Sequence, residues 1–295
     1  MTDFPKAVSV VMRCKDEGWA VGNTIKQLFN QDFDGEIELI VIDSGSTDGS
    51  LEAIAAAKPA KLIQIQPHDY IPGVVMNRGA AEASHDWIIY LNADAEPVGR
   101  DWLKELLTSA INTPKFGAGF SRQIARPDCQ AVFAHGLDQC FGPDRESTGW
   151  EHFFSMVSSI THRSVLDAHP FREDLQYAED DEWTRRLIAH GYQIPFAEKS
   201  VVMHSHNYTL QQSYKRAFGD AKAMAATSNK PPENAVVRWF AIGLGWANDT
   251  RKDLRWCAAH QRISELPHAA AVRFYQRLGR NDGYRAGWKH YQREP

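Results

Sequence analysis

The chain has 295 residues, of which 43% are hydrophobic and 24% charged, and its formal net charge is −4, as is usual for a soluble globular protein. No apolar run approaches the roughly 18 residues of a membrane span, and the N-terminal MTDFPKAVSVV lacks the apolar core of a signal peptide. The cysteines form no C-x-x-C pair, which excludes a disulfide-rich secreted domain and predicts a reducing cytoplasm; they are Cys14, Cys129, Cys140 and Cys257.

Strand and helix patterns alternate through the first part of the chain. The apolar, β-branched run at 7–13 predicts a buried strand, and helical spacing follows over residues 19–30. Three more strand and helix pairs follow, with strands predicted at 37–45, 61–66 and 87–94 and helices at 46–57, 74–84 and 101–111. This alternation predicts an α/β fold with a mostly parallel, doubly wound sheet. In such sheets ligands bind beyond the carboxyl ends of the strands, where Asp43 and Asp94 lie.

From about residue 115 the pattern loosens into short strands and loops. A helix is predicted from near Asp180 to just before Gly191, then a β segment over 193–206 and a long helix over 208–226. The segment NKPPEN, residues 229–234, is the clearest linker. We therefore predict a main domain over residues 1–228 and a basic, Trp-rich helical extension over residues 229–295.

The extension is basic although the chain as a whole is acidic. Residues 251–295 hold ten Lys or Arg against four Asp or Glu, whereas the preceding residues hold 23 basic and 33 acidic side chains. Such a segment predicts an anionic neighbour. Nucleic acid and a membrane surface both fit, and we prefer the membrane to nucleic acid. The extension either contacts an anionic membrane or is a helical subdomain packed on the main domain or on a dimer partner. The membrane contact would involve Trp239, Trp246, Trp256, Arg251, Lys252 and Arg255.

Five motifs occur in the order seen in family 2 glycosyltransferases: VSVVMRCKDEG, VIDSGSTDGS, NRGAAEA, YLNADAEP and AEDDEWTRRLIAHGY. The chain resembles that family over roughly residues 7–218. The resemblance implies the GT-A fold, a Rossmann-like nucleotide-binding domain, and a nucleotide-sugar donor. Within the family, FSRQIARP, YAEDDEWTRR and VVMHSHNYTLQQSYKR are similar to bacterial rhamnosyltransferases of surface polysaccharide biosynthesis.

The resemblance also implies a divalent cation, Mg²⁺ or Mn²⁺, which offsets the charge of the departing diphosphate. The family's Asp-x-Asp motif matches Asn92-Ala93-Asp94, so Asp94 is the predicted metal ligand and the first acid is missing. Glu96 either replaces that acid or is a favourable charge at the start of the next helix. A late histidine completes the metal shell in many such enzymes, which makes His204 and His206 further candidates, His204 being preferred.

The nucleotide site implied by the resemblance involves both of the first two strands. Asp43 matches the residue that accepts a hydrogen bond from the donor's base, although Asp43 can equally serve as a turn residue. Arg78 either meets the donor or is a solvated surface charge. Glu17 either lines the nucleotide pocket or opens the following helix. The predicted nucleotide-binding residues are Arg13, Lys15, Glu17, Asp43, Arg78, Asn92 and Ala93.

A sugar hydroxyl is a poor nucleophile and needs a carboxylate to accept its proton. The family's Glu-Asp pair matches Glu179 and Asp180, and the resemblance makes Asp180 the base. Glu179, Asp181 and Trp183 are predicted to contact the acceptor, although Glu179 can close the helix start and Asp181 can act as a favourable first-turn charge.

The predicted function is an inverting, metal-dependent hexosyl transfer, with rhamnose from a dTDP-activated donor as the preferred sugar. The predicted acceptor is a glycan or a polyprenyl-linked glycan, at the cytoplasmic face of the inner membrane. One alternative is a family 2 enzyme that uses a UDP- or GDP-hexose. A sugar-nucleotide pyrophosphorylase is a second, but MRCKDEGW has one glycine where those enzymes carry a Gly-rich loop. An inactive binding module is a third, supported by Asn92 and opposed by the intact Glu179–Asp180 pair.

Overall fold

The structure is a computed structural model that describes residues 4–225 and 230–291. It divides into two compact units. The first unit consists of residues 1–124 and 146–204, and the second consists of residues 125–145 and 205–295. The predicted boundary at 228/229 falls outside the described residues. The second unit therefore includes a helix at 210–224 and a segment at 125–145 that the sequence pattern assigned to the main domain.

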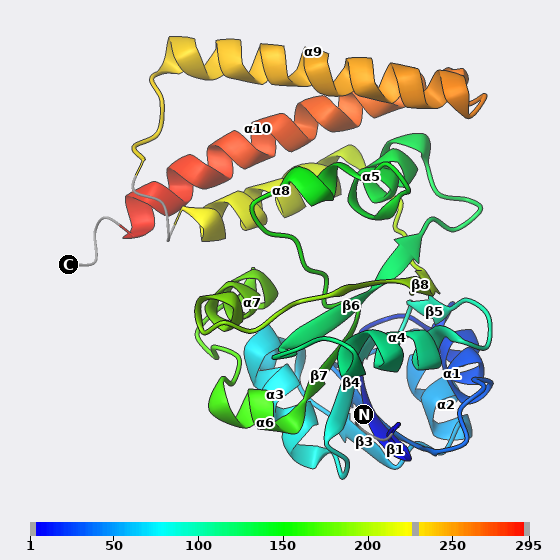
Figure 1. Cartoon of the computed structure of the whole chain (residues 1–295). Helices are drawn as coiled ribbons and strands as arrows, with labels where there is room; N and C mark the ends of the chain where they lie inside the picture. Colours follow the sequence, from blue (N-terminus) through cyan, green and yellow to red (C-terminus); the bar gives the residue numbers. More distant parts are fainter. Residues whose placement is uncertain (1–3, 226–229, 292–295) are drawn as a thin grey trace. The chain divides into compact units, whose positions relative to one another are not determined.

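The first unit has the alternation of strands and helices that the sequence predicts (Figure 1). Its N-terminal half contains β1 (Ala7–Cys14), α1 (Val21–Phe29), β2 (Glu36–Asp43), α2 (Ser50–Ala56), β3 (Lys61–Gln64), α3 (Pro72–Glu82), β4 (Trp87–Asn92), β5 (Glu96–Pro97) and α4 (Trp102–Ile111). Its remaining elements are β6 (Ala118–Ile124), β7 (Ser158–His162), α6 (Arg163–Ala168), α7 (Glu179–Ala189) and β8 (Phe196–Met203).

The strands form one eight-stranded sheet in the order β3-β2-β1-β4-β7-β6-β8-β5. Strands β1 to β4 pair in parallel, as expected, and β6 pairs in parallel with β8. Strand β7 runs antiparallel to both of its neighbours, and β5 runs antiparallel to β8. The sheet is therefore mixed, with an antiparallel strand inserted between two parallel parts.

Successive side chains of the central strands enter cores on opposite faces of the sheet, because neighbouring residues of a strand point to opposite sides. Val10 and Met12 of β1 pack in a core with side chains of α1 and α4. Val11 packs in a second core with side chains of α3 and α7. Both faces are thus covered, which explains why β1 reads as an uninterrupted apolar run.

The register of the central strands brings three loops to one edge of the sheet. Arg13 lies beside Ile42 of β2 and beside Asn92 of β4, and Cys14 lies beside Asp43. All three strands therefore end at the same level, and the residues that follow them share one crevice. This is where an open α/β sheet places a ligand.

The second unit is helical, consisting mainly of α5 (Ala131–Phe141), α8 (Leu210–Met224), α9 (Ala235–Ala259) and α10 (Leu266–Tyr291) (Figure 1). Helix α10 approaches α8 through Gly279, Gly283 and Gly287, spaced four residues apart. A Cβ atom at any of them would lie within 2.4 Å of a backbone oxygen of α8, so the close packing requires glycine. Within the described ranges, no helix has both the length and the apolarity to cross a membrane.

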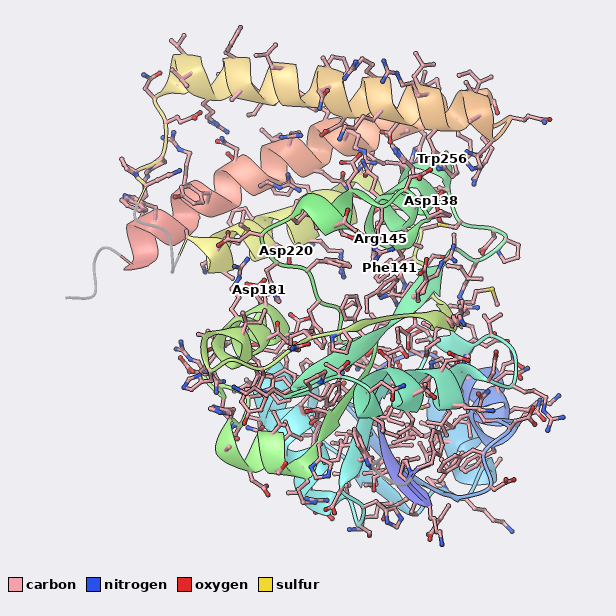
Figure 2. All side chains as sticks on the ribbon, in the orientation of Figure 1. Asp138, Phe141, Arg145, Asp181, Asp220 and Trp256 are labelled. Carbon is pink, nitrogen blue, oxygen red and sulfur yellow. The ribbon has the colours of Figure 1, made fainter. Side chains whose placement is uncertain are left out.

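A buried ion pair holds α5, α9 and α10 together. The fully buried Asp253 accepts hydrogen bonds from Arg273 Nε (2.8 Å) and Nη2 (2.9 Å), and its Oδ1 lies 2.5 Å from His135 Nδ1. Desolvation works to raise the pKa of Asp253, but the hydrogen bonds from Arg273 and His135 outweigh it and lower the pKa. Trp256 Nε1 also donates to Asp138 Oδ2 at 2.7 Å (Figure 2).

Candidate active site

A cavity of about 410 Å³ opens at the carboxyl ends of β1, β2 and β4. Its volume is within the range of small-molecule sites, about 300–1,000 Å³. Its lining is Arg13, Cys14, Lys15, Glu17, Ser44, Pro67, Tyr70, Asn92, Ala93 and Asp94. Five of the seven predicted nucleotide-binding residues thus lie in one cavity, next to the predicted metal ligand Asp94, although their role toward a nucleotide stays a prediction.

The other two predicted nucleotide-binding residues, Asp43 and Arg78, are placed differently. Asp43 is fully buried, and its Oδ1 accepts hydrogen bonds from the backbone N–H groups of Gly45 and Ser46, both at 2.9 Å. Asp43 therefore shapes the turn after β2, and its contact with a base stays a prediction. Arg78 is exposed on α3 and is absent from the cavity lining.

The loops after β1 and β2 are tied to each other, which fixes one wall of the cavity. Asp16 N donates to Ser46 Oγ at 2.8 Å, and Gly18 N donates to Asp48 Oδ2 at 2.8 Å. Lys15 Nζ donates to the carbonyl oxygen of Gly45 at 2.5 Å. Hydroxyl and carboxyl groups of SGSTDGS thus accept hydrogen bonds from backbone N–H groups of the first loop. This explains why serine and aspartate are frequent in the motif.

Arg13 connects the cavity to the start of α7. Its Nη2 donates to Asn92 Oδ1 at 2.9 Å, and its Nη1 donates to Tyr70 OH at 3.3 Å. The same Nη1 lies 3.9 Å from Glu179 Oε1, with both side chains mostly buried. Asn92, at the position of the missing acid, therefore holds Arg13. Tyr70 was missed by sequence reasoning, although PHDY follows the third strand at the same sheet edge.

The acids that open α7 have distinct environments. Glu179 is buried and Asp180 is half-buried, and they follow Ala178, whose φ of 58° is unusual for a residue other than glycine. Desolvation raises the pKa of Asp180 to about 7, and the neighbouring carboxylate of Glu179 raises it too, while Arg13 opposes the shift. A carboxylate with a pKa near 7 suits a general base at neutral pH.

Two predicted acceptor contacts lie farther along α7. Asp181 is exposed, and its Oδ2 accepts a hydrogen bond from Arg185 Nε at 2.9 Å, one helical turn away. Trp183 is 1% exposed, its Nε1 donates to the carbonyl oxygen of His169 at 2.7 Å, and its ring packs against Phe171. The prediction for Trp183 is therefore corrected, because this side chain belongs to the core. The contact of Asp181 with an acceptor stays a prediction.

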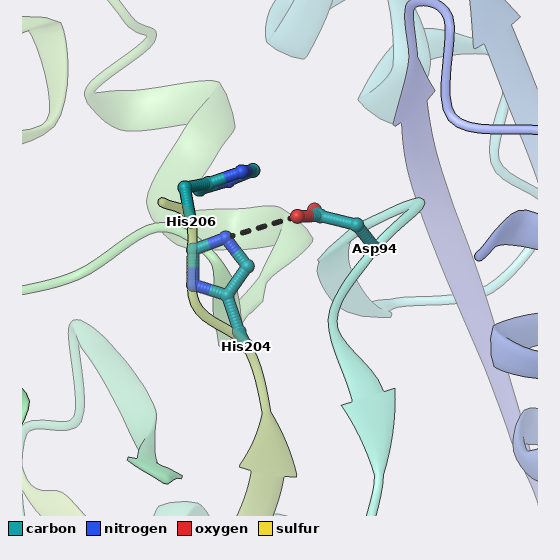
Figure 3. Close-up of side chains that lie close together, drawn as sticks. All are labelled: Asp94, His204 and His206. Atoms are coloured by element: carbon teal, nitrogen blue, oxygen red, sulfur yellow. Dashed lines mark ion pairs between the residues drawn. The ribbon is translucent and has the colours of Figure 1, made fainter. Parts of the chain in front are cut away.

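Asp94 and the two histidines form a cluster with the composition of a metal site (Figure 3). Asp94 Oδ2 lies 3.4 Å from His204 Nε2, and one ligand atom from each of Asp94, His204 and His206 lies within 4.8 Å of the others. His204 Nδ1 lies 2.9 Å from Gln123 Oε1, which orients Nε2 toward Asp94. A metal-binding histidine is commonly fixed by such a bond from its other nitrogen. Gln123 carried no signal in the sequence.

Glu96, the acid that sequence analysis left with two roles, lies in β5, where it pairs with Met203 of β8. The metal-site cluster does not include it. Its place in a strand rather than at a helix start also differs from the second predicted role. The start of α4 follows at Trp102.

Comparison with solved structures defines the class of fold. The mannosyltransferase PcManGT of Pyrobaculum calidifontis, solved with GDP-Man and Mn²⁺, matches 92% of this chain and 74% of its own, with a TM-score of 0.58 and 19% identity. Glucosyl-3-phosphoglycerate synthase of Mycobacterium tuberculosis, solved with Mn²⁺ and UDP, matches 75% of this chain and 78% of its own, with a TM-score of 0.51 and 18% identity. The fold is that of a GT-A glycosyltransferase, as predicted.

The sequence comparisons define the family. Residues 9–169 match the model of Glycosyl transferase family 2, and the chain belongs to this family of glycosyltransferases. The O-antigen chain rhamnosyltransferase WbaN of Salmonella anatum is 29% identical over 221 residues, 71% of this chain and 70% of WbaN. RfbN of Salmonella typhimurium, also named an O-antigen chain rhamnosyltransferase, is 28% identical over 61% of each chain. The predicted resemblance to rhamnosyltransferases is thereby confirmed.

Proposed function

We propose that this glycosyltransferase transfers rhamnose from a dTDP-activated donor to a hydroxyl of a glycan, or of a lipid-linked glycan, in bacterial surface polysaccharide assembly. The two similar Salmonella proteins named as O-antigen chain rhamnosyltransferases support this choice of sugar and pathway. The transfer is a single displacement with inversion. The bond between the sugar C1 and the diphosphate oxygen breaks with its electron pair on that oxygen, while the acceptor oxygen bonds to C1.

The observation that carries the proposal is the position of Arg13. This side chain touches Asn92 at the cavity and approaches Glu179, the neighbour of Asp180. A cavity of nucleotide size and a carboxylate with the pKa of a general base are thereby joined through one guanidinium. In the proposed reaction Asp180 accepts the proton of the acceptor hydroxyl, and Glu179 orients the acceptor.

Asp94, His204 and His206 are the proposed ligands of a divalent cation. One carboxylate oxygen and two imidazole nitrogens fit Mn²⁺ better than Mg²⁺, because Mg²⁺ is bound almost entirely by oxygen. A bound cation at this position neutralises negative charge on the diphosphate. Asn92 occupies the place of a second acid, so the chain itself supplies one negative charge where the common motif supplies two.

The direct test of the function measures nucleotide release from dTDP-rhamnose, UDP-glucose and GDP-mannose with Mn²⁺ or Mg²⁺. Each donor is supplied with and without a lipid-linked glycan acceptor. We expect acceptor-dependent release with dTDP-rhamnose. Equal release without acceptor would contradict the transfer, and release from another donor would contradict the choice of sugar.

The raised pKa of Asp180 predicts an acid limb in the pH profile. The base must be ionised, so kcat/KM should fall about tenfold per pH unit below pH 7 and level off above it. Because Arg13 opposes the rise in this pKa, Arg13→Gln should move the midpoint to higher pH. The measurement is kcat/KM between pH 5 and 9 for both proteins.

Lys15→Gln is the matched control, since Lys15 is also a cation of the cavity, whereas Arg13 is the cation among the main causes of the pKa shift at Asp180. Its midpoint should equal that of the unmodified protein. A flat profile in the unmodified protein, or an unchanged midpoint in Arg13→Gln, would exclude Asp180 as the titrating base.

We propose further that the outer face of α9 lies on an anionic membrane. Val236, Phe240 and Leu244 are 81%, 67% and 58% exposed and share one face at four-residue spacing. Arg251 and Arg255, farther along the helix, are exposed too. Apolar side chains beside cations are the pattern of a helix that lies in a membrane interface. Of the tryptophans in the predicted contact, Trp239 is 52% exposed, whereas Trp246 and Trp256 donate hydrogen bonds within the second unit.

Flotation with anionic liposomes tests this surface. The unmodified protein should float at low salt and less at high salt, because each basic residue near such a surface contributes about 1 kcal/mol. Phe240→Glu combined with Leu244→Glu should abolish flotation. Phe29→Glu, which changes a 48% exposed phenylalanine of α1, is the control and should float normally. Unchanged flotation of the double variant would remove α9 from the contact.

A further inference from the structure

The second unit contains a cavity of its own, with a volume of about 430 Å³. It is bounded by the end of α8, by residues 230–233, by α9 and by α10. This volume again falls in the range of small-molecule sites. None of its lining residues belongs to the predicted nucleotide, metal or acid sites, so its role is separate from theirs.

The polar part of this cavity is strongly cationic. Lys230, Arg277, Arg280 and Arg285 line it, against one acid, Glu233. The three arginines lie within a short stretch of α10, and Arg277 is paired with Asp249. The pKa of Arg280 is lowered, first by desolvation and then by the positive charge of Arg277, although acids nearby oppose the shift. An anion in the cavity would relieve this repulsion.

Two of the arginines are held in place. Arg277 donates to Asp249 through Nε (2.7 Å) and Nη2 (2.8 Å), and it crosses close to Gly245, where a Cβ would lie 2.7 Å from its Cζ. Arg285 Nη1 donates to the carbonyl oxygen of Glu233 at 3.0 Å. Arg280, in contrast, donates no hydrogen bond to any residue that the structure describes. Its planar set of N–H donors is suited to phosphate oxygens.

The rest of the lining is largely apolar. It includes Met224, Pro231, Pro232 and Ile242. Asn281 also lines the cavity, and its Oδ1 is buried without a hydrogen-bond partner among the described residues. A ligand that satisfies this lining has an anionic end and an apolar end. A free inorganic anion would leave the apolar wall without a partner.

From this arrangement we infer that the cavity binds a phosphate or diphosphate ester of an apolar alcohol. The phosphate oxygens lie against Arg280 and Arg285, and the apolar chain lies against Met224, Pro231 and Pro232. The inference rests on this cavity alone and not on the proposed transfer reaction. Its test therefore measures binding rather than turnover.

Isothermal titration calorimetry with the full chain tests the site, using geranyl diphosphate, pyrophosphate and geraniol as probes. A chelator is present, so that a cation at Asp94 does not recruit diphosphate to the other cavity. Geranyl diphosphate should bind more tightly than either fragment. Arg280→Gln should weaken its binding by about 10- to 100-fold, as expected for a lost charge-assisted hydrogen bond. Met224→Asp should weaken the binding of geranyl diphosphate but not the binding of pyrophosphate.

Lys215→Gln is the matched control, because Lys215 is an exposed cation of α8 that does not line the cavity. It should bind all probes normally. Thermal unfolding checks that each variant folds, and Arg280→Lys, which keeps the charge, replaces Arg280→Gln if that variant does not. Unchanged affinity of Arg280→Gln for geranyl diphosphate would contradict the proposed site. Equal affinity of the unmodified protein for pyrophosphate and geranyl diphosphate would contradict the contact with an apolar chain and identify the ligand as a free diphosphate.

Discussion

Asp180→Asn should lower kcat by about 10²- to 10⁴-fold, the usual contribution of a positioned general base. Asparagine keeps the shape of the side chain but cannot accept the hydroxyl proton. The pKa of about 7 strengthens this expectation, since Asp180 is a stronger base than an ordinary carboxylate and is still half ionised at neutral pH. The affinity for donor and cation should barely change. Single-turnover rates with saturating acceptor, together with donor binding by calorimetry, measure the two effects separately.

Asp181→Asn is the matched control for the base. Asp181 is exposed and is held by Arg185, so its loss should cost far less turnover. It also leaves the Arg13–Glu179 contact in place. If Asp181→Asn were the more severe change, the base would be Asp181, and the family motif would be displaced by one residue in this chain.

The strands and helices of the first half of the fold are predictable from the sequence. Strands β1 to β4 follow one another in the chain and pair in parallel, and the central ones are buried on both faces. Both faces of β1 are covered by helices, and a strand in that position needs an unbroken apolar run. The strand ends are equally predictable, because Asp43 directly follows an apolar run and Asp94 comes just after another, beyond Asn92 and Ala93. Strands and the polar residues at their ends are thus predictable, because both depend on residues that are adjacent in the sequence.

Helix α5 was missed because its partners lie far along the chain. Gln130, just before it, makes no side-chain cap, and Gly136 interrupts its middle. The helix is stabilised instead by contacts with distant residues. Ala131 N donates to Glu265 Oε2 at 2.8 Å, and His135 pairs with Asp253. The hydrophobic pattern of residues 125–145 does not predict these contacts. Tertiary contacts therefore determine that this segment is helical, as they often do where local helix propensity is weak.

The errors within the candidate site have a similar origin. Trp183 stands among acids in sequence, which indicates a surface position, yet it packs against Phe171. Helical geometry separates it from Asp180, because the burial of Glu179, Trp183 and Leu187 shows that four-residue spacing defines the inner face of α7. The link from Asn92 through Arg13 to Glu179 also spans three distant segments, and no single motif contains it.

Asp94→Asn should lower metal-dependent turnover by at least about 100-fold, because even outer partners of metal ligands contribute about 10- to 100-fold. Asn92 leaves Asp94 as the one acid of the motif, so the chain has no second carboxylate there to retain the cation. Asparagine preserves the shape of a side chain that is 3% exposed, and the fold should persist. Electron paramagnetic resonance of free Mn²⁺ measures binding, and thermal unfolding checks the fold.

Two neighbouring substitutions separate Asp94 from the other candidates for this role. Glu96→Gln removes an acid two residues away that does not belong to the cluster with His204 and His206, and Mn²⁺ binding should be retained. Asn92→Asp restores the common motif and should bind Mn²⁺ at least as tightly, although it replaces the amide oxygen that accepts from Arg13 by a carboxylate. Loss of Mn²⁺ binding in Glu96→Gln, with retention in Asp94→Asn, would transfer the ligand role to Glu96.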